Sequence, residues 1–368
     1  MAHNSVFSKI FLSYLKKHYS IKENDSTELG EVKKVLIVRQ HNQLGDMLAS
    51  VSLFRAIKEK YPDSKIYLVV SPVNKSAIIK NKYVDDYFVF DKPKIFLPTR
   101  FIKFIKFLRQ GFDVVIVPST VSVSFTSNLI SRISKSRVRI GVKSLDGKVN
   151  ESSFFFDKRI ELDWRKDPDS NVADFILDIV RPFGITTNDF SSNITFNNSD
   201  LDVANKFVNK IRENKQNRLI GLHIGAGKPQ NKWSLNKYIK LVELLDNHYK
   251  CSFYLTGSKF DEEELNYVKI NSKVKIHQFI NHTIHEAAAL ISISDLYITN
   301  DTGLMHVAGI THTPQISLFG PTNPFNWAPY GEDKIFIRKS DLIDDIETED
   351  VFEVCKFLLN KSDGKEKN

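Results

Sequence analysis

Short apolar runs of strand length alternate with amphipathic stretches along most of the chain. Residues 35–38 are consecutive aliphatic residues and predict a buried strand. Further strands are predicted at residues 66–70, 87–90 and 114–117. A helix that ends before Pro62 is predicted by apolar residues at three- and four-residue spacing, namely Leu44, Leu48, Val51, Phe54 and Ile57. This alternation is typical of a parallel sheet covered by helices.

The alternation fades between about residues 145 and 200, where one helix is predicted over residues 171–183. It then resumes, with strands predicted at residues 219–224, 251–256, 274–277, 296–298 and 315–319. The two cycles predict an α/β protein of two Rossmann-like, doubly wound domains. We place these domains at residues 1–190 and 191–345. Residues 346–368 are predicted to form a helix near residues 349–359, followed by a disordered polar tail from Ser362.

A polar turn follows the strand predicted at residues 296–298. Asn300 to Gly303 lead directly into a predicted helix, and the unpaired amides at a helix N-terminus favour a phosphate or diphosphate. Thr302 and Gly303 would supply amides, while Asp301 and His306 add groups that bind hydroxyls or a ribose. The alternative is a capped helix whose aspartate serves only the fold.

Several other site types are disfavoured. The first predicted strand–helix turn has one glycine, Gly45, so it lacks the fingerprint of a dinucleotide-dependent dehydrogenase. A second glycine-rich run has Pro229 where a P-loop needs Ser or Thr. The Asp-x-Asp pairs at residues 167–169 and 200–202 lie in the weakly patterned middle, and Asp200 fits a helix start. The sequence therefore predicts no metal site.

Composition indicates a globular protein with an uneven distribution of charge. The 368 residues are 42% apolar, and no apolar run is long enough to span a membrane. The start of the chain shows no secretion signal, and Cys251 and Cys355 are expected to be reduced thiols, which predicts a cytoplasmic location. Residues 1–150 carry 26 Lys and Arg against 12 Asp and Glu, whereas the rest carries 26 against 32.

The basic first half predicts an anionic partner. Nucleic acid, a phosphorylated glycolipid and a membrane surface all fit, and lysine-rich solvated faces are the alternative. Residues 94–109 are both basic and strongly apolar, and residues 7–17 have a similar character. A buried helix with charged ends, or peripheral contact with a membrane, would account for residues 94–109.

Four segments resemble the heptosyltransferase family, glycosyltransferase family 9, in order and spacing. They are residues 34–49, 221–235, 297–308 and 313–327. Three positions depart from the family pattern: Ile224 and Ser234 stand where proline is common, and His312 stands where a small residue is typical. These departures bear on the identity of the donor sugar.

The resemblance implies a GT-B fold, in which two Rossmann-like domains face across a cleft. It implies an inverting glycosyltransferase without an obligatory metal or other cofactor, with an ADP-sugar, ADP-heptose, as donor. The acceptor, a lipopolysaccharide core or related anionic surface glycolipid, would bind residues 1–190, and the nucleotide sugar would bind residues 191–345. A cytoplasmic enzyme at the inner face of the inner membrane is expected. Another nucleotide sugar for a different surface glycan, a catalytically silent binding module and a nucleic-acid binder are the alternatives.

The resemblance also assigns roles to individual residues. Asp46 matches the catalytic base, although an N-cap for the following helix is an alternative. Lys232 matches the lysine that neutralises the donor diphosphate, with a surface lysine before a helix capped by Ser234 as the alternative. Asp261 is the nearest match to an acidic residue that holds the nucleoside, or else it only favours a helix N-terminus. Gly225 and Gly227 would offer amides to the donor, and Arg137 and Arg139 would meet acceptor phosphates or carboxylates.

Overall fold

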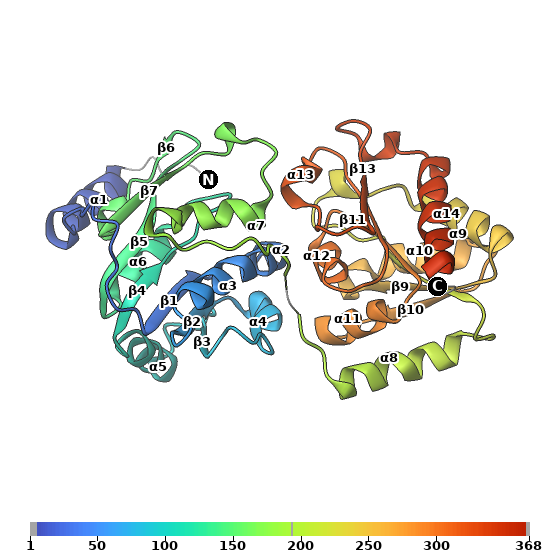
Figure 1. Cartoon of the computed structure of the whole chain (residues 1–368), viewed down its shortest axis with the longest axis horizontal. Coiled ribbons are helices and arrows are strands. Elements are labelled where there is room, and N and C mark those ends of the chain that lie inside the picture. Colours follow the sequence, from blue (N-terminus) through green and yellow to red (C-terminus); the bar gives the residue numbers. More distant parts are fainter. Residues whose placement is uncertain (1–5, 193, 366–368) are drawn as a thin grey trace. The chain divides into compact units, whose positions relative to one another are not determined.

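The fold is described from a computed structural model, which describes residues 6–192 and 194–365 (Figure 1). Contacts between Cα atoms divide the chain into two compact units, Met1–Phe190 and Ser191–Asn368. We call them the N-terminal unit and the C-terminal unit. Each unit is an α/β assembly with its own sheet.

The N-terminal unit contains a seven-stranded sheet in the order β3-β2-β1-β4-β5-β6, with β7 paired to β5. All of these pairs are parallel except β5 with β6. The strands are β1 (Lys34–Arg39), β2 (Lys65–Val70), β3 (Asp86–Val89), β4 (Phe112–Ile116), β5 (Ser136–Leu145), β6 (Lys148–Val149) and β7 (Lys158–Leu162). The helices are α1 (Val6–Tyr19), α2 (Leu44–Ala49), α3 (Val51–Lys60), α4 (Pro72–Ile78), α5 (Pro98–Leu108), α6 (Phe125–Ile133) and α7 (Val172–Phe175).

The C-terminal unit repeats this plan with a six-stranded, wholly parallel sheet in the order β10-β9-β8-β11-β12-β13. Its strands are β8 (Arg218–His223), β9 (Cys251–Gly257), β10 (Ile276–Ile280), β11 (Leu296–Asn300), β12 (Gln315–Leu318) and β13 (Lys334–Ile337). Its helices are α8 (Asn198–Ile211), α9 (Leu235–His248), α10 (Glu262–Asn271), α11 (Ile284–Ser292), α12 (Gly303–Gly309), α13 (Pro324–Trp327) and α14 (Thr348–Lys365).

The central strands explain why both sheets are stable. Residues 35–39 of β1, and all but the first residue of β8, are buried, as expected for parallel strands with helices on both faces. In the C-terminal unit the core of β8, β9 and β11 is closed by Trp233 and Tyr238 and by the inward face of α14.

The predicted fold class is confirmed, and the predicted strands recur within three residues of their expected bounds. The prediction for residues 200–202 is also confirmed, because Asp200 and Asn197 form a capping box at the start of α8. The predicted helix over residues 171–183 is partly confirmed, because helical turns cover residues 172–179 and 181–183, but they do not form one continuous α-helix. Only α7 is α-helical there, and short 3-10 turns follow, because Pro182 lacks an N–H group and Gly184 turns the chain at a positive φ of 65°.

The predicted tail is partly wrong, because α14 continues through Lys365. Within α14, the side chain of Lys361 makes ion pairs with Glu332 and Asp333, each at 2.7 Å. These pairs help to hold the last turns of the helix. Residues 366–368 lie outside the described part of the chain.

Both cysteines are free thiols, and burial raises the pKa of Cys251 to about 12. Among residues 6–192 and 194–365, no helix is long and apolar enough to cross a membrane. Over the same residues, no group of three or more His, Cys, Asp or Glu side chains could hold a metal ion.

Candidate active site

Asp46 lies in the first turn of α2, just beyond the carboxyl end of β1. Its side chain is buried, and Oδ1 accepts hydrogen bonds from Arg39 Nη2 at 2.9 Å and from Thr120 Oγ1 at 3.0 Å. The N-cap of α2 is Gln43, so the alternative in which Asp46 caps the helix is wrong. Its carboxylate is instead held by an arginine and a hydroxyl from neighbouring strand ends.

Arg39 is the last residue of β1 and is itself tightly held. Its Nη1 donates to the carbonyl of Pro118 at 3.1 Å, and Nη2 also donates to Thr120 Oγ1 at 3.3 Å. Trp164 fixes this loop, because its Nε1 donates to the carbonyl of Thr120 at 2.6 Å. Burial lowers the pKa of Arg39, and the charge and hydrogen bond of Asp46 oppose that shift. Sequence reasoning missed this partner, although a charge ending an aliphatic strand was a visible signal.

Asn300 organises the edge of the second sheet and was not predicted as a site residue. This buried side chain ends β11 and donates to the carbonyls of Ile224 at 2.9 Å and Gly225 at 3.3 Å. Its Oδ1 accepts from the hydroxyl of Tyr238 at 3.0 Å and from the amide of Trp233 at 3.4 Å. One amide group thus joins β11, the loop after β8 and the start of α9.

Asp301 and Thr302 follow directly. Asp301 Oδ2 accepts from Asn231 Nδ2 at 2.9 Å. Burial raises the pKa of Asp301, while a hydrogen bond from Thr322 and the charge of Lys228 act in the opposite direction. Thr302 is the N-cap of α12, yet its side chain makes no cap hydrogen bond, and its Oγ1 is buried without a protein partner. A buried hydroxyl without a hydrogen-bond partner destabilises the folded protein, so the Thr302 hydroxyl is suited to form a hydrogen bond with a ligand.

Lys232 is held by an ion pair within the same unit. Its Nζ lies 2.5 Å from Oε1 of Glu264, in the first turn of α10, and both side chains are about one third exposed. The second oxygen of Glu264, Oε2, is buried and has no protein partner. Lys232 is therefore neither an isolated surface lysine nor a fully buried one.

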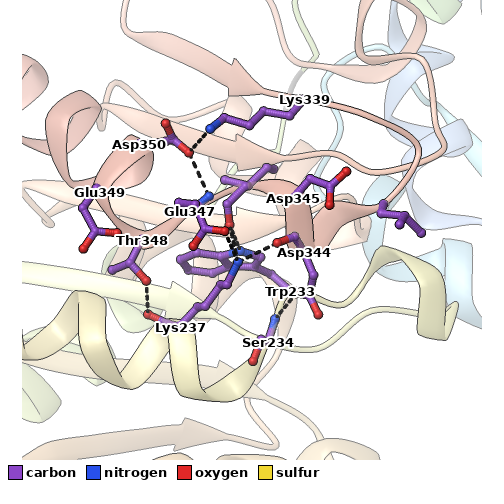
Figure 2. A network of polar contacts seen from close by, with 12 residues as sticks. Trp233, Ser234, Lys237, Lys339, Asp344, Asp345, Glu347, Thr348, Glu349 and Asp350 are labelled. Carbon is purple, nitrogen blue, oxygen red and sulfur yellow. Dashed lines mark hydrogen bonds and ion pairs between the residues drawn. The ribbon is translucent and has the colours of Figure 1, made fainter.

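The backbone that carries Lys232 is anchored by the network in Figure 2. The indole Nε1 of Trp233 donates to the carbonyl of Ile346 at 2.8 Å, and the amide of Ser234 donates to Asp344 at 2.8 Å. Lys237 Nζ donates to the carbonyls of Asp344 at 2.5 Å and Ile346 at 3.1 Å. Ser234 is the N-cap residue of α9, but its side chain makes no cap hydrogen bond. The segment before α14 thus fixes the position of Lys232.

Asp261 and Gly225 lie against each other. Asp261 Oδ2 accepts from the amide and the hydroxyl of Ser258 in a capping box, which supports the alternative that it serves a helix start. A Cβ at Gly225 would lie 2.6 Å from Oδ1 of Asp261, so this glycine permits the approach, whereas Gly227 has open space around it. Burial lowers the pKa of the nearby His223, whose Nδ1 donates to the carbonyl of Thr256 at 3.0 Å.

The predicted donor residues gather at one edge of the second sheet. The loops after β8, β9 and β11 carry them, and these three parallel strands are neighbours that end at this edge. Gly303 opens α12, and His306 lies within it, with its ring 6.5 Å from that of Trp327. Ligands of open α/β sheets bind at the carboxyl ends of the strands.

Arg137 and Arg139 are placed differently. Both lie in the first half of β5, whereas Asp46 follows the carboxyl end of the parallel strand β1. Arg137 donates to the carbonyl of Leu29 at 2.7 Å. Arg139 donates to the carbonyl of Ser131 at 3.1 Å and pairs with Asp157 at 3.4 Å. These bonds give both arginines structural roles, and the prediction that they bind the acceptor finds no support in their placement.

Comparison with known proteins identifies relatives over most of the chain. The sequence model of glycosyltransferase family 9 (heptosyltransferase) matches residues 101–353. The chain is 25% identical over 312 residues to lipooligosaccharide heptosyltransferase 2 of Haemophilus influenzae. This alignment covers 80% of this chain and 86% of that protein.

Two solved structures show the same fold. A family 9 glycosyl transferase from Veillonella parvula superposes with a TM-score of 0.77 at 20% identity, covering 92% of this chain and all of the other. ADP-heptose lps heptosyltransferase II of E. coli superposes with a TM-score of 0.73 at 19% identity, covering 90% and 99%. The fold is therefore GT-B, with two Rossmann-like domains.

Proposed function

The chain belongs to glycosyltransferase family 9, the heptosyltransferases, and we propose on that premise that it transfers heptose from ADP-heptose to a lipopolysaccharide core. The observation that carries the proposal is the set of donor residues at one edge of the second sheet. There Lys232 carries a positive charge, and Thr302, the N-cap of α12, has a buried hydroxyl without a protein partner. Both groups suit a diphosphate.

In the proposed reaction, Asp46 accepts the proton of an acceptor hydroxyl. The hydroxyl oxygen then forms a bond to the anomeric carbon of the donor sugar while the bond from that carbon to the diphosphate breaks, with inversion. ADP leaves with the electron pair of the broken bond. We assign Arg39 and Thr120 the task of aiming the carboxylate of Asp46, because both donate to Oδ1.

We assign the departing diphosphate to Lys232 and to the amides of Thr302 and Gly303. Asp301 would hold hydroxyls of the donor sugar, and His306 would reach the ribose or a phosphate. Asp261, Gly225 and Gly227 border the same edge, and we propose that Asp261 contributes to the nucleoside site. No step requires a metal ion in this scheme.

On the acceptor side, we propose that an anionic glycolipid binds the N-terminal unit, on the cytoplasmic face of the inner membrane. The charge distribution supports this assignment, because residues 1–150 have a net charge of +14 and the remaining residues −6.

A ligand panel tests the proposal. ADP-heptose and ADP should raise the unfolding temperature of the purified protein, because a ligand that binds only the folded state stabilises it. UDP- and GDP-sugars should not do so at the same concentration. Transfer of labelled heptose to a heptose-deficient core glycolipid should follow. Stabilisation by UDP- or GDP-sugars alone would overturn the donor assignment, and binding of ADP-heptose without transfer to any acceptor would indicate a silent module.

A further inference from the structure

The most unusual surface of the N-terminal unit surrounds the start of α5, the teal helix at the lower left of Figure 1. We call it the α5 surface. Its apolar members are Phe96, Leu97, Phe101 and Ile102, with Phe96 81% and Ile102 66% exposed. Its basic members, also exposed, are Lys92, Lys94, Arg100, Lys103, Lys106 and Arg109.

These outward side chains are not needed by the core. The opposite face of α5 is filled by Phe104, Phe107 and Leu108, which pack into the apolar cluster of the sheet. Phe104 lies 5.3 Å from Phe90 between ring centroids, and Phe107 lies 6.2 Å from Tyr67. The helix is therefore docked firmly by one face, while the other presents large apolar groups to solvent. Such patches on a folded protein mark interaction sites.

Within residues 91–109 the charged side chains are all basic except Asp91. This residue lies 3.6 Å from Lys94 and 3.7 Å from Arg100. Lys103 and Lys106 form no ion pair with the residues that the structure describes. A helix with bulky apolar residues beside unpaired lysines matches the requirements of an anionic lipid surface, where apolar groups enter the acyl boundary and lysines meet phosphates.

The C-terminal unit offers a contrast. Phe260 is fully exposed there, but it stands beside Asp261 and three consecutive glutamates at residues 262–264. An anionic surface would repel that region. Exposed apolar groups thus occur in both units, and in the described part of the N-terminal unit they lie beside cations at α5 and also at α1, where Ile10 and Phe11 are close in sequence to Lys9 and Lys16.

The position of the α5 surface also fits the chemistry. The segment that carries Phe96 follows the carboxyl end of β3. Because β3, β2 and β1 are parallel, this segment starts at the same edge of the sheet as the loop between β1 and Asp46. Lys92 lies in the same segment, just after the end of β3. A lipid surface held here would bring a membrane-embedded acceptor toward the edge that carries Asp46.

We propose that the α5 surface binds the anionic surface of a lipid bilayer, with Phe96 and Ile102 entering the headgroup boundary and Lys103 and Lys106 facing lipid phosphates. This inference rests on the proposed function only in that the acceptor is a glycolipid. The binding itself requires neither donor nor acceptor.

Cosedimentation with vesicles tests it. The wild-type protein should bind vesicles of phosphatidylglycerol and phosphatidylethanolamine, bind phosphatidylcholine vesicles much less, and lose affinity as salt is raised. Phe96→Ser with Ile102→Ser should weaken binding to the anionic vesicles at least about tenfold, since two large apolar groups no longer enter the bilayer. The matched control, Ile270→Ser with Leu342→Ser, removes two apolar side chains that are also strongly exposed, 78% and 67%, and should bind as wild type.

A second pair of variants tests the charges without touching the apolar groups. Lys103→Gln with Lys106→Gln should weaken binding to anionic vesicles by about tenfold and leave the weak binding to neutral vesicles unchanged. Thermal unfolding of each variant verifies the fold. Helix α1 also exposes two large apolar side chains, Ile10 and Phe11. The variant Ile10→Ser with Phe11→Ser therefore tests whether α1 contributes to vesicle binding.

Three results would overturn the proposal. They are no binding of the wild-type protein to anionic vesicles, full binding by both α5 variants, and loss of binding only in the α1 variant. A dimer that is broken by the α5 variants, with no vesicle binding, would assign the surface to a second copy of the chain and would also overturn it. Transfer to a short soluble acceptor separates this outcome from the proposed function: retained transfer without vesicle binding rejects the α5 surface alone, and vesicle binding without any transfer rejects the function alone.

Discussion

The two units share one architecture but differ in the burial of the ion pairs at their candidate sites. In the N-terminal unit, Asp46 and Arg39 form a pair at 2.9 Å in which both side chains are at least nine-tenths buried. In the C-terminal unit, Lys232 and Glu264 form a pair at 2.5 Å in which each side chain is about one third exposed. Arg39 donates further hydrogen bonds to Pro118 and Thr120, although its Nε has no protein partner, and Oε2 of Glu264 likewise has none.

This difference has a physical consequence. Removing one member of a buried pair leaves a charge that is both desolvated and unpaired, which costs about 3–5 kcal/mol. A partly exposed pair contributes only about 0–1 kcal/mol, so a ligand with a stronger charge can displace one member. The N-terminal pair is therefore suited to hold a carboxylate in one orientation through a reaction. The C-terminal pair is suited to release its lysine to a diphosphate.

The largest effect is expected from Asp46→Asn. Asn cannot accept a proton from the acceptor, so transfer should slow by at least about a hundredfold. The variant should also lose about 3 kcal/mol of unfolding free energy, because Arg39 would remain buried without an anionic partner. Transfer rates and denaturant unfolding measure the two effects separately.

The double variant Arg39→Met with Asp46→Leu is the control. It removes both charges and should regain most of the lost stability, because an apolar pair often replaces a buried ion pair without loss. It should remain inactive. Full activity in Asp46→Asn would place the base elsewhere, and unchanged stability would show that the buried pair does not behave as described.

The second prediction concerns the exchangeable pair. Lys232→Ala should lower the transfer rate by about a hundredfold through loss of a charge beside the leaving diphosphate. It should change the unfolding free energy by less than about 1 kcal/mol. Lys240→Ala is a matched control, because Lys240 also pairs with a glutamate, Glu349, at 2.6 Å. That variant should alter neither quantity. Normal turnover in Lys232→Ala would remove this lysine from the donor site.

A smaller effect should follow from Glu264→Gln. If the donor must displace Glu264 from Lys232, neutralising Glu264 should tighten ADP binding up to about fivefold, which corresponds to the strength of a partly exposed pair. Calorimetric titration with ADP measures the change. Weaker binding would instead show that Glu264 contacts the nucleotide directly, through the oxygen that has no protein partner.

The contrast between the two pairs lies beyond what the sequence could predict. The periodicity of apolar residues identified both sheets, since a buried parallel strand needs a continuous apolar run. It missed β5 and β7, whose charged residues alternate with apolar ones, and the short strand β13. These strands became visible only through their pairing with neighbours in the sheets.

The same limit applies to the candidate site. Asp46 and Lys232 could be named because they stand beside glycine and tryptophan in recognisable segments. Their distant partners could not, because Thr120 lies 74 residues from Asp46 and Glu264 lies 32 residues from Lys232. Asn300 belongs to the polar turn predicted before α12, but its role in joining β11 to the loop after β8 depends on a hydrogen bond to Ile224. Contacts of this kind are made by the tertiary fold and leave no periodic signal.

The last and smallest expected effect is a pH dependence of the unfolding free energy that comes from one histidine of the C-terminal unit. His223 is buried in the C-terminal unit, and burial lowers its pKa, while its bond to Thr256 and the charge of Asp261 oppose the shift. The folded protein therefore binds fewer protons at this ring than the unfolded chain does below about pH 6.5. Stability from His223 is complete above that pH and declines as the pH falls toward the lowered pKa of the folded state, by at most about 1.4 kcal/mol per pH unit.

His223→Asn should make the unfolding free energy less dependent on pH between about 5 and 6.5, because Asn can still donate to the carbonyl of Thr256 but does not titrate. Denaturant unfolding at a series of pH values measures the slope. The control is His282→Asn, since His282 is partly exposed, where it pairs with Glu286 at 3.2 Å and stacks on the ring of Phe279. An unchanged slope in His223→Asn would mean that this histidine is not held neutral by burial. The difference between the units would then rest on their ion pairs alone.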